Sequence, residues 1–209
     1  MSIEKQPGGR VERAPRAKRS VDLILAALGA PFALPACIIA ALLIRAETPG
    51  SPVFAQERLG KDQKPIVVYK LRTMYNDTKD LPSHAVSTAK ITRVGSFLRR
   101  TKVDELPQIW NVLRGDMSFV GPRPCLPSQS ELIEEREARG VFTVVPGITG
   151  PGQLAGIDMS TPVELAEADG QYLQQQSLIF DLGCIISTAL GRGSGDAAGN
   201  APAEANSVL

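Results

Sequence analysis

Two adjacent carboxylates, Asp104 and Glu105, stand near the middle of the chain in a stretch rich in cationic side chains. The stretch runs from Arg99 to Pro124 and reads RRTKVDELPQIWNVLRGDMSFVGPRP. A carboxylate can act as a nucleophile in phosphoryl transfer or bind Mg²⁺, and an arginine can donate two hydrogen bonds to one phosphate. Arg99 and Arg123 flank the carboxylates on either side. This combination predicts a site that binds a phosphorylated substrate together with a metal ion.

The two carboxylates are expected to serve different purposes. Neighbouring residues on a helix point about 100° apart, so Asp104 and Glu105 would not share one contact. One could reach a substrate atom while the other binds a metal or anchors the helix. A purely structural interpretation is also open, because acidic residues in the first turn of a helix complement its dipole. Asp116, which follows Gly115, could likewise be only a turn residue.

The elements that must position these residues can be traced from the hydrophobic pattern. A short amphipathic helix is predicted after the carboxylates, from apolar residues at helical spacing: Leu106, Ile109, Trp110 and Leu113. Further helices are expected over residues 91–100, 128–139, 161–174 and 178–190. The charges of the 128–139 helix are expected to form a solvated face. Residues 144–152 are rich in glycine and proline and predict a loop of irregular backbone.

A β-hairpin is expected upstream of the carboxylates. Residues 53–56 and 66–72 are β-prone runs, and the segment between them carries turn residues. Lys70 and Arg72 alternate with apolar neighbours, so both cations are predicted on one face of the second strand. They are therefore candidates for binding an anionic substrate.

The N-terminal part of the chain has the composition of a membrane anchor. Residues 1–17 predict a disordered basic arm suited to anionic headgroups, and Lys18 and Arg19 extend its charge. Residues 23–44 carry no charge, and roughly 20 apolar residues are enough to cross a bilayer. A secretory signal peptide is the first alternative, but this run is longer than the apolar region of such signals, and no convincing cleavage site follows.

Pro31 and Pro35 lie near the middle of the apolar run, where each removes a backbone hydrogen bond. Both flanks are basic, so the positive-inside rule cannot assign opposite sides to them. A helix that enters the membrane, breaks at the prolines and returns to the same face satisfies both flanks. A kinked single span and a buried helix of a soluble protein remain alternatives. Asp22, at the boundary of the run, is expected to pair with a nearby Arg or Lys.

Composition excludes several other classes of site. A net charge of +1 argues against a general nucleic-acid binder, which usually carries a large basic excess. Cys37, Cys125 and Cys184 are too few and too scattered for a disulfide framework or a thiolate zinc site. His84 is the only histidine, which excludes a metal site built on several histidines and disfavours a serine–histidine–aspartate triad.

Read as one string, DELPQIWNVLRGDMSFVGPRP resembles the signature of the bacterial sugar transferase family, small monotopic phosphoglycosyl transferases that act on polyprenol phosphate. The resemblance covers roughly residues 18–190. In order, it takes in KRSVDLILA, PVFAQERLGKDQKPIVVYKLRTM, RVGSFLRRTKVDELPQIWNVLRGDMSFVGPRP and PGITGPGQLAG. The motifs are specific in combination.

The resemblance implies an α+β fold that is mostly helical. It implies a re-entrant membrane helix over residues 18–47 that is broken at Pro35, followed by an interfacial catalytic domain over residues 48–190. The arm of residues 1–17 and the tail of residues 191–209 are expected to be disordered. The implied location is the cytoplasmic face of the bacterial inner membrane, and a homodimer is a possible assembly.

The resemblance also implies a mechanism. Asp104 corresponds to the nucleophile, which attacks the β-phosphate of a UDP-sugar, releases UMP and carries the phosphosugar until polyprenol phosphate accepts it. Glu105 is the second member of the dyad, and Mg²⁺ is expected between Asp104 and the diphosphate. Arg123 corresponds to a nucleotide-binding arginine and Arg99 to a phosphate-binding one. No nucleic-acid partner is implied.

Some positions depart from the family pattern. Leu34 stands where a serine often precedes the helix-breaking proline, and Pro151-Gly152 replaces Trp-Ala in the PGITG loop. Val145 and Ile157 replace the arginines that commonly flank that loop. The resemblance therefore does not identify the sugar. The alternatives are a non-enzymatic membrane scaffold, a membrane-anchored phosphatase and a processed secreted protein.

Overall fold

A computed structural model describes residues 16–75 and 90–193 of the chain. The described part is mostly helical, with two small two-stranded sheets, which confirms the predicted α+β class. The helices are α1 (Arg16–Glu47), α2 (Arg93–Thr101), α3 (Gln108–Arg114), α4 (Ser130–Ala138), α5 (Pro151–Leu154), α6 (Pro162–Gln175) and α7 (Leu178–Ala189). The strands are β1 (Val53–Leu59), β2 (Pro65–Leu71), β3 (Ser118–Val120) and β4 (Gly147–Thr149), and 3₁₀ turns form at η1 (Lys61–Gln63), η4 (Val103–Glu105) and η5 (Val141–Thr143).

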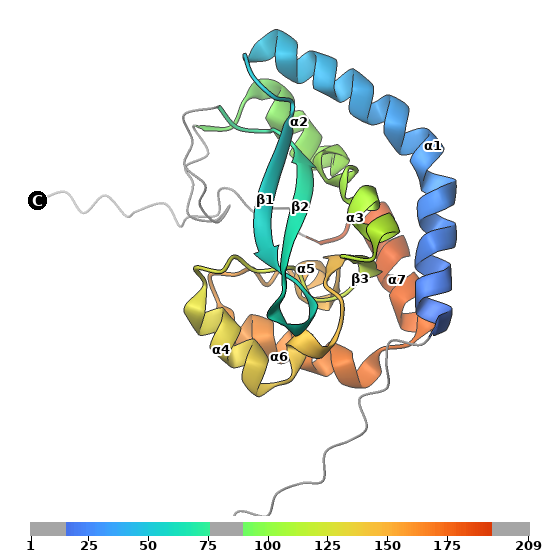
Figure 1. Ribbon diagram of the computed structural model, residues 1–209, viewed down its shortest axis with the longest axis vertical. Helices are drawn as coiled ribbons and strands as arrows, with labels where there is room; N and C mark the ends of the chain where they lie inside the picture. The colour runs from blue at the N-terminus through green and yellow to red at the C-terminus, as the bar shows by residue number, and fades with distance from the viewer. Residues whose placement is uncertain (1–15, 76–89, 194–209) are drawn as a thin grey trace, which may run out of the picture.

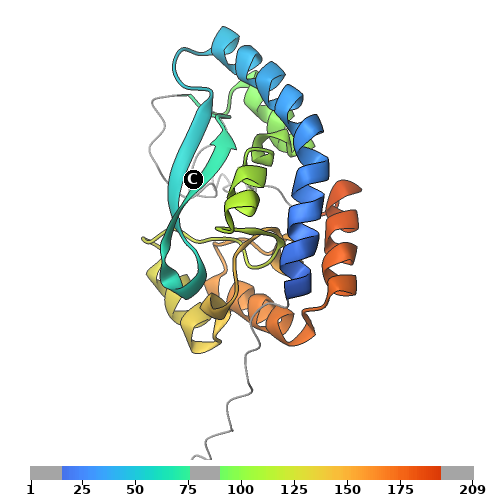
Figure 2. The ribbon, with the colours of Figure 1, turned by 45° about the vertical axis from the view of Figure 1, so that its right-hand side comes forward.

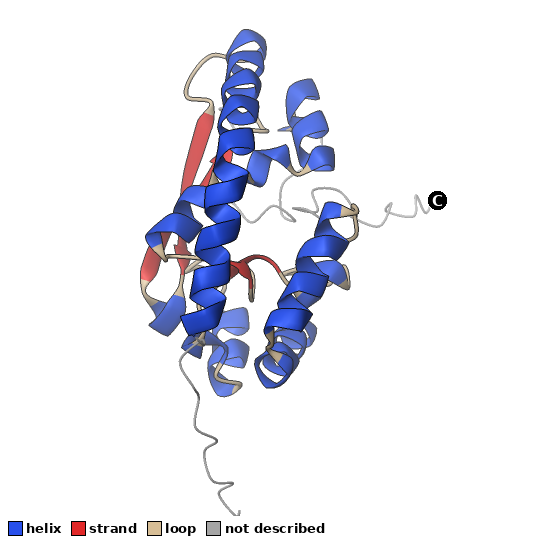
Figure 3. Cartoon of the chain, turned by 90° about the vertical axis from the view of Figure 1, so that its right-hand side faces the viewer, coloured by secondary structure: helices blue, strands red, loops and turns tan. Residues whose placement is uncertain are grey.

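Helix α1 runs along one side of the molecule and covers the other elements from that side (Figure 1, Figure 3). Its inward face is built from small residues two turns apart, Ala26, Ala33 and Ala40, all of them buried. Its outward face is apolar and uncovered, with Leu28 65% and Phe32 80% exposed. Among the described helices, α1 alone is long and apolar enough to cross a membrane.

The prolines of α1 do not interrupt it. The helix is continuous over 32 residues with Pro31 and Pro35 inside, and it follows a curved path (Figure 1). A proline removes one hydrogen bond and bends a helix, but the packing of α1 against α2 and α3 holds the two halves together. At Pro35 we therefore see a continuous curved helix where the sequence suggested a break. Re-entrant insertion into a membrane stays a prediction.

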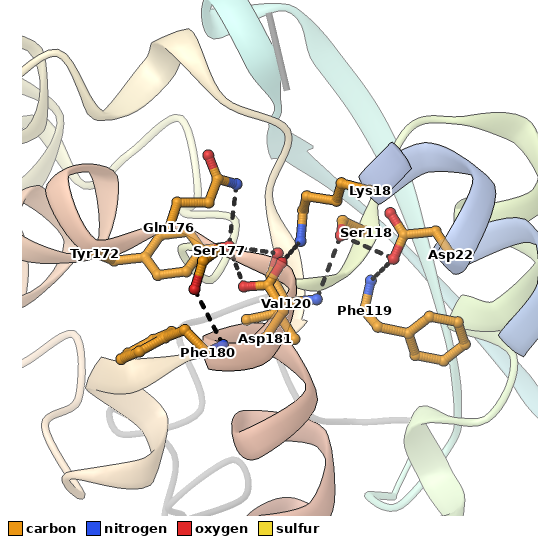
Figure 4. Close-up of polar contacts among 10 residues, drawn as sticks. All are labelled: Lys18, Asp22, Ser118, Phe119, Val120, Tyr172, Gln176, Ser177, Phe180 and Asp181. Carbon is orange, nitrogen blue, oxygen red and sulfur yellow. Dashed lines mark hydrogen bonds and ion pairs between the residues drawn. The ribbon is translucent and has the colours of Figure 1, made fainter. Parts of the chain in front are cut away.

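The N-terminal end of α1 is joined to the rest of the fold by a buried polar network (Figure 4). Asp22 accepts hydrogen bonds from Ser118 Oγ (3.1 Å) and Phe119 N (3.2 Å) of β3. The expectation that Asp22 pairs with an Arg or Lys is wrong, because the Ser118 hydroxyl and the Phe119 backbone N–H of β3 supply the donors. Lys18 instead forms an ion pair with Asp181 of α7, and both side chains are buried.

Two further contacts complete this junction. Burial and the neighbouring Asp181 raise the pKa of Tyr172, so its hydroxyl stays protonated and donates to Asp181 Oδ1 (2.9 Å). Arg19 donates to the carbonyls of Val112 and of Leu113 (2.9 Å for Leu113) at the C-terminal end of α3. The cations at positions 18 and 19, which the sequence suggested for lipid headgroups, therefore make contacts inside the protein. The ion pair thereby joins the N-terminal ends of α1 and α7 (Figure 2).

The predicted hairpin is confirmed. Strands β1 and β2 pair antiparallel, with Gln56 opposite Val68 and Val53 opposite Leu71. Val68 and Leu71 face the interior, where they pack with residues of α1, α2 and α3. The hairpin therefore supports α2 and α3, the helices on either side of the two adjacent carboxylates.

The helices predicted over residues 91–100, 161–174 and 178–190 are confirmed as α2, α6 and α7. The 128–139 helix is confirmed as α4, but its charges do not all face solvent. Arg136 is 1% exposed and pairs with the buried Asp169 of α6 at 2.7 Å. The interpretation of a fully solvated face is wrong for this residue, because a partner on α6 compensates its buried charge.

The segment 144–152 is more ordered than its composition suggests. It contains β4, which pairs parallel with β3, and the start of α5. A side chain at Gly147 would place its Cβ only 2.1 Å from the backbone nitrogen of Gly121. Only a glycine permits this close approach, which brings β4 against the turn that follows β3.

Candidate active site

The carboxylate pair lies in η4, a single 3₁₀ turn between α2 and α3. Lys102 precedes it in the left-handed conformation, with φ of 57°, and this sharp change of direction ends α2. Asp104 is 4% exposed and Glu105 is 9% exposed. Successive side chains of a 3₁₀ helix point about 120° apart, so the two carboxylates face different surroundings.

Glu105 joins cations from two other elements. Its Oε1 accepts a hydrogen bond from Arg123 Nη2 at 2.8 Å and lies 3.6 Å from Lys70 Nζ. All three side chains are largely shielded from solvent, with exposed side-chain fractions of 10%, 15% and 13% for Glu105, Arg123 and Lys70. The structure thus brings together Glu105 of the dyad, the turn after β3 and the C-terminal end of β2. A concentration of positive charge beside two carboxylates suits a polyanionic substrate.

Arg99 lies on α2 with its guanidinium at the end of β2. Its Nε donates to Thr73 Oγ1 at 2.8 Å, while Nη1 is buried and has no hydrogen-bond partner in the described part of the chain. The Gln108 side chain, one turn after Asp104, is 3% exposed, and its Nε2 is likewise without a partner there. Buried donors without acceptors are costly, so oxygen atoms of a ligand are a natural complement.

Arg72 is used elsewhere. Its guanidinium donates to the carbonyl of Pro49 and to the carbonyl and hydroxyl of Thr48, at 2.8 to 2.9 Å. These bonds fasten the turn after α1 to the end of β2. The two cations predicted on one strand face therefore divide, with Lys70 at the dyad and Arg72 at the connection between α1 and β1.

The altered PGITG loop contributes a further polar group. Gln153 of α5 is 8% exposed, and both its amide nitrogen and its amide oxygen lack partners among the described residues. A Cβ at Gly150 would lie 2.9 Å from Gln153 Oε1 and 2.4 Å from the Gly121 carbonyl, so the amide sits close to the turn that carries Arg123. Sequence reasoning missed Gln108 and Gln153, although Gln108 follows Asp104 at i+4, the spacing that places two residues on one helical face.

The residues present fit Mg²⁺ only if the substrate completes its coordination. Among the described residues, no group of three or more His, Cys, Asp or Glu side chains could hold a metal ion. Glu105 contacts two cations, and Asp104 is the protein ligand that the sequence predicts. Mg²⁺ is usually bound through one or two carboxylates together with substrate phosphates, and this donor set matches that arrangement.

Cysteine nucleophiles are disfavoured at this site. Cys125 follows the turn that carries Arg123 and is fully buried. Burial raises the pKa of the Cys125 thiol, and burial likewise raises the pKa of Cys184 in α7. A thiol with a raised pKa is a poor nucleophile near neutral pH. His84 lies outside the described residues.

Comparisons with known proteins agree with the geometry. A family model described as bacterial sugar transferase matches residues 13–192. A UDP-glucose:undecaprenyl-phosphate glucose-1-phosphate transferase of Caulobacter vibrioides is 39% identical over 194 residues, which cover 88% of this chain and 73% of that protein. The Escherichia coli K12 protein of the same name is 38% identical over 182 residues, which cover 82% of this chain and 39% of that protein.

A relative from Aeromonas hydrophila is named for another sugar. This UDP-N-acetylgalactosamine-undecaprenyl-phosphate N-acetylgalactosaminephosphotransferase is 32% identical over 181 residues, 82% of this chain and 42% of that protein. The chain therefore spans less than half of the Escherichia coli and Aeromonas proteins but most of the Caulobacter one. The family match over most of the chain and the identity to these relatives show that the chain belongs to the bacterial sugar transferase family and is a sugar-phosphate transferase.

Proposed function

We propose that this enzyme transfers a sugar-1-phosphate from a UDP-sugar to undecaprenyl phosphate and releases UMP, as a membrane step of polysaccharide synthesis. The observation that carries the proposal is the buried Asp104 beside the cluster of Glu105, Arg123 and Lys70. The names of the three relatives each contain a UDP-sugar and undecaprenyl phosphate, but the sugar is glucose in two names and N-acetylgalactosamine in the third. The sugar is the part that these names do not share.

The proposed chemistry has two steps. The Asp104 carboxylate attacks the β-phosphorus of the UDP-sugar, the bond from that phosphorus to the bridging oxygen breaks, and UMP leaves with the bridging oxygen. An oxygen of undecaprenyl phosphate then attacks the same phosphorus, the bond to Asp104 breaks, and the carboxylate is restored. Asp104 would be the protein ligand of Mg²⁺, which would supply positive charge to neutralise the phosphate oxygens.

The surrounding side chains have separate tasks in this scheme. Arg123 and Lys70 neutralise the diphosphate. Glu105 fixes the positions of both cations through its contacts with them. Arg99 offers its unpartnered Nη1, and Gln108 its Nε2, to oxygen atoms of the donor or acceptor. Arg72 supports the fold behind them through its bonds to the turn after α1.

The acceptor demands an active site at the membrane surface. The phosphate of a polyprenol lies at headgroup depth while its chain stays in the hydrocarbon, so the nucleophile must be held at that depth. The uncovered apolar face of α1 provides this attachment, and we propose that α1 is re-entrant with the catalytic domain on the cytoplasmic face of the inner membrane. A non-enzymatic scaffold would use the same face but would have no use for a buried dyad bridged to an arginine.

The test is UMP release by the purified full chain with Mg²⁺ and a panel of UDP-sugars, with and without undecaprenyl phosphate. Wild type should release UMP continuously only with lipid and one preferred sugar, and Asp104→Asn should release none while retaining its fold. Mass spectrometry without lipid should show one phosphosugar on the peptide that contains Asp104. Continuous release by Asp104→Asn would reject the nucleophile, and release of free sugar phosphate in place of a lipid product would indicate a phosphatase.

A further inference from the structure

The turn that carries Arg123, formed by Gly121, Pro122, Arg123 and Pro124, is held from behind by two buried guanidinium groups. Arg136 Nη1 donates to the Arg123 carbonyl at 2.8 Å, and Arg58 Nη1 donates to the Pro124 carbonyl at 3.0 Å. Arg58 comes from β1 and is 6% exposed; Arg136 comes from α4 and is 1% exposed. Two consecutive carbonyls therefore receive charged donors from two distant parts of the chain.

Each of these arginines is itself fixed by a partner. Asp169 Oδ2 of α6 accepts from Arg136 Nε at 2.9 Å and from Arg136 Nη2 at 2.7 Å. Gln56 Oε1 of β1 accepts from Arg58 Nε at 2.8 Å and also from its Nη2. A guanidinium bound through two nitrogens has little freedom to rotate, so its remaining nitrogen is aimed in one direction. We call these four residues the carbonyl clamp.

The turn depends on such external bonds because of its sequence. Pro122 and Pro124 have no N–H, so half of the turn cannot donate a backbone hydrogen bond. The bonds on its β4 side, from Gly121 N to the Thr149 carbonyl and from Gly147 N to the Pro122 carbonyl, hold only its first half. The clamp holds the second half, directly at the residue whose side chain reaches Glu105.

Stability alone does not explain the carbonyl clamp. Burying a guanidinium group carries a large desolvation penalty, and apolar side chains of similar volume often give equal or greater stability. What a rigid, charged donor does supply is a fixed position for its acceptor. The path runs from Asp169 to Arg136, through the Arg123 carbonyl, to the Arg123 guanidinium 2.8 Å from Glu105.

We propose that Arg136 and Arg58, fixed by Asp169 and Gln56, are positioning residues for the transfer reaction. They set the place of the Arg123 guanidinium, and thereby the affinity of the enzyme for the nucleotide diphosphate. This inference rests on the proposed function. A lysine at position 136 keeps the charge but cannot donate to Asp169 and to the Arg123 carbonyl with the same fork geometry.

The test compares Arg136→Lys and Asp169→Asn with wild type, each also in an Arg123→Ala background, by transfer kinetics, UMP binding calorimetry and thermal unfolding. A misplacement of about 1 Å can cost on the order of 100-fold, so we expect kcat/KM to fall about 10- to 100-fold, mostly through a higher KM for the UDP-sugar. In the Arg123→Ala background the same substitutions should lower kcat/KM by less than about a further 2-fold, because they act through the Arg123 guanidinium, which that background lacks. The affinity for UMP should fall by about the same factor as the KM for the UDP-sugar rises.

The matched control is Arg139→Lys, on the same helix, where the guanidinium pairs with Glu135 and Glu167 near the surface and should leave KM unchanged. Should Arg136→Lys fail to fold, Arg58→Lys tests the clamp at the Pro124 carbonyl. Unchanged KM and UMP affinity with only a lower melting temperature would overturn the inference, as would effects that multiply fully in the Arg123→Ala background. A wild type that neither binds UMP nor transfers overturns the proposed function instead.

Discussion

Glu105 is the residue on which the site's electrostatics converge, since one of its oxygens lies beside both Arg123 and Lys70. If it only complemented a helix dipole, its partners would be backbone N–H groups. Its partners are instead two side chains from other elements. Glu105 therefore organises the two cations. The roles of Asp104 as nucleophile and metal ligand stay predictions.

This role of Glu105 predicts the effect of Glu105→Gln. The amide keeps the size of the side chain but loses its negative charge, so Arg123 and Lys70 lose this anionic partner and their positions change. We expect kcat/KM to fall about 100-fold, comparable to removing a preorganised charge in other active sites, with a small change in melting temperature. Steady-state kinetics and thermal unfolding measure the two effects.

Glu137→Gln, an exposed position on α4, is the control for charge alone and should leave kcat/KM as it is. A Glu105→Gln enzyme with wild-type kinetics would mean that Glu105 has only a structural role. A large loss of melting temperature would mean the same, because the cluster would then be holding the fold.

At the residue scale, charged residues that lie in one sequence motif could be recognised as functional candidates. Asp104, Glu105 and Arg123 are charged and lie in one motif, so their proximity could be predicted. Gln153 is a neutral amide without a periodic signal, and Gln108 is a neutral amide marked only by its i+4 spacing from Asp104. Charged residues dominate the sequence of α4 and predict solvent exposure for Arg136, and only the position of Asp169 on α6 explains its burial.

At the element scale, the site depends on the contact between β4 and the turn after β3. These two strands pair in parallel over three residues each, with Ser118 opposite Gly147. Gly147 lies so close to Gly121 that no Cβ fits between them. A short sheet thus replaces what looked from composition like a loop, because a glycine-rich segment can form a strand where another backbone approaches closely.

Gly147→Ala tests this contact. The added methyl group would meet the Gly121 nitrogen at 2.1 Å, and backbone rather than a flexible side chain would have to move. Overpacking of this kind typically costs about 1–3 kcal/mol, and here it also displaces the turn that carries Arg123. We expect a lower melting temperature and a kcat/KM reduced by more than the loss of folded protein explains.

Gly183→Ala is the matched control, because a Cβ at this α7 position meets no atom within 4 Å. Alanine is favoured over glycine inside a helix, so this variant should be as stable as wild type or slightly more so. Equal behaviour of the two variants would show that the close approach at Gly147 is not needed.

Elements with a clear hydrophobic period were predictable, and those without one were not. The hairpin and helices α2, α6 and α7 follow from alternation or helical spacing, α4 follows from its charged composition, and all are present. Strands β3 and β4 have three residues each, too few for a period to show. The continuity of α1 through two prolines depends on its packing against α2 and α3, which local sequence does not encode.

At the scale of the whole molecule, both ends of α1 are attached to the same domain. Lys18 and Asp22 bind α7 and β3 near the N-terminal end. At the other end, Glu47 accepts hydrogen bonds from the backbone nitrogens of Arg93 (2.8 Å) and Val94 (2.9 Å) at the start of α2. The helix is therefore supported along its length by one body of protein.

This attachment argues against a simple span. At 1.5 Å per residue a helix of 32 residues is about 48 Å long, more than the roughly 30 Å of bilayer hydrocarbon. A straight span would put the two ends on opposite sides of the membrane, and their contacts with one domain could not both persist. We therefore predict that the segments on either side of α1 lie on the same side.

Cysteine labelling decides between the two topologies. In a background without the three native cysteines, single cysteines at Lys5 and Lys61 should both be protected from a membrane-impermeant maleimide in intact cells and both react once the inner membrane is opened. A periplasmic marker protein, labelled in intact cells, controls for reagent access. Reaction of Lys5→Cys alone in intact cells would show that α1 crosses the bilayer. The contacts of Lys18 and Asp22 with the catalytic domain would then have to break when the helix inserts, and Asp181 would be left buried without its cation.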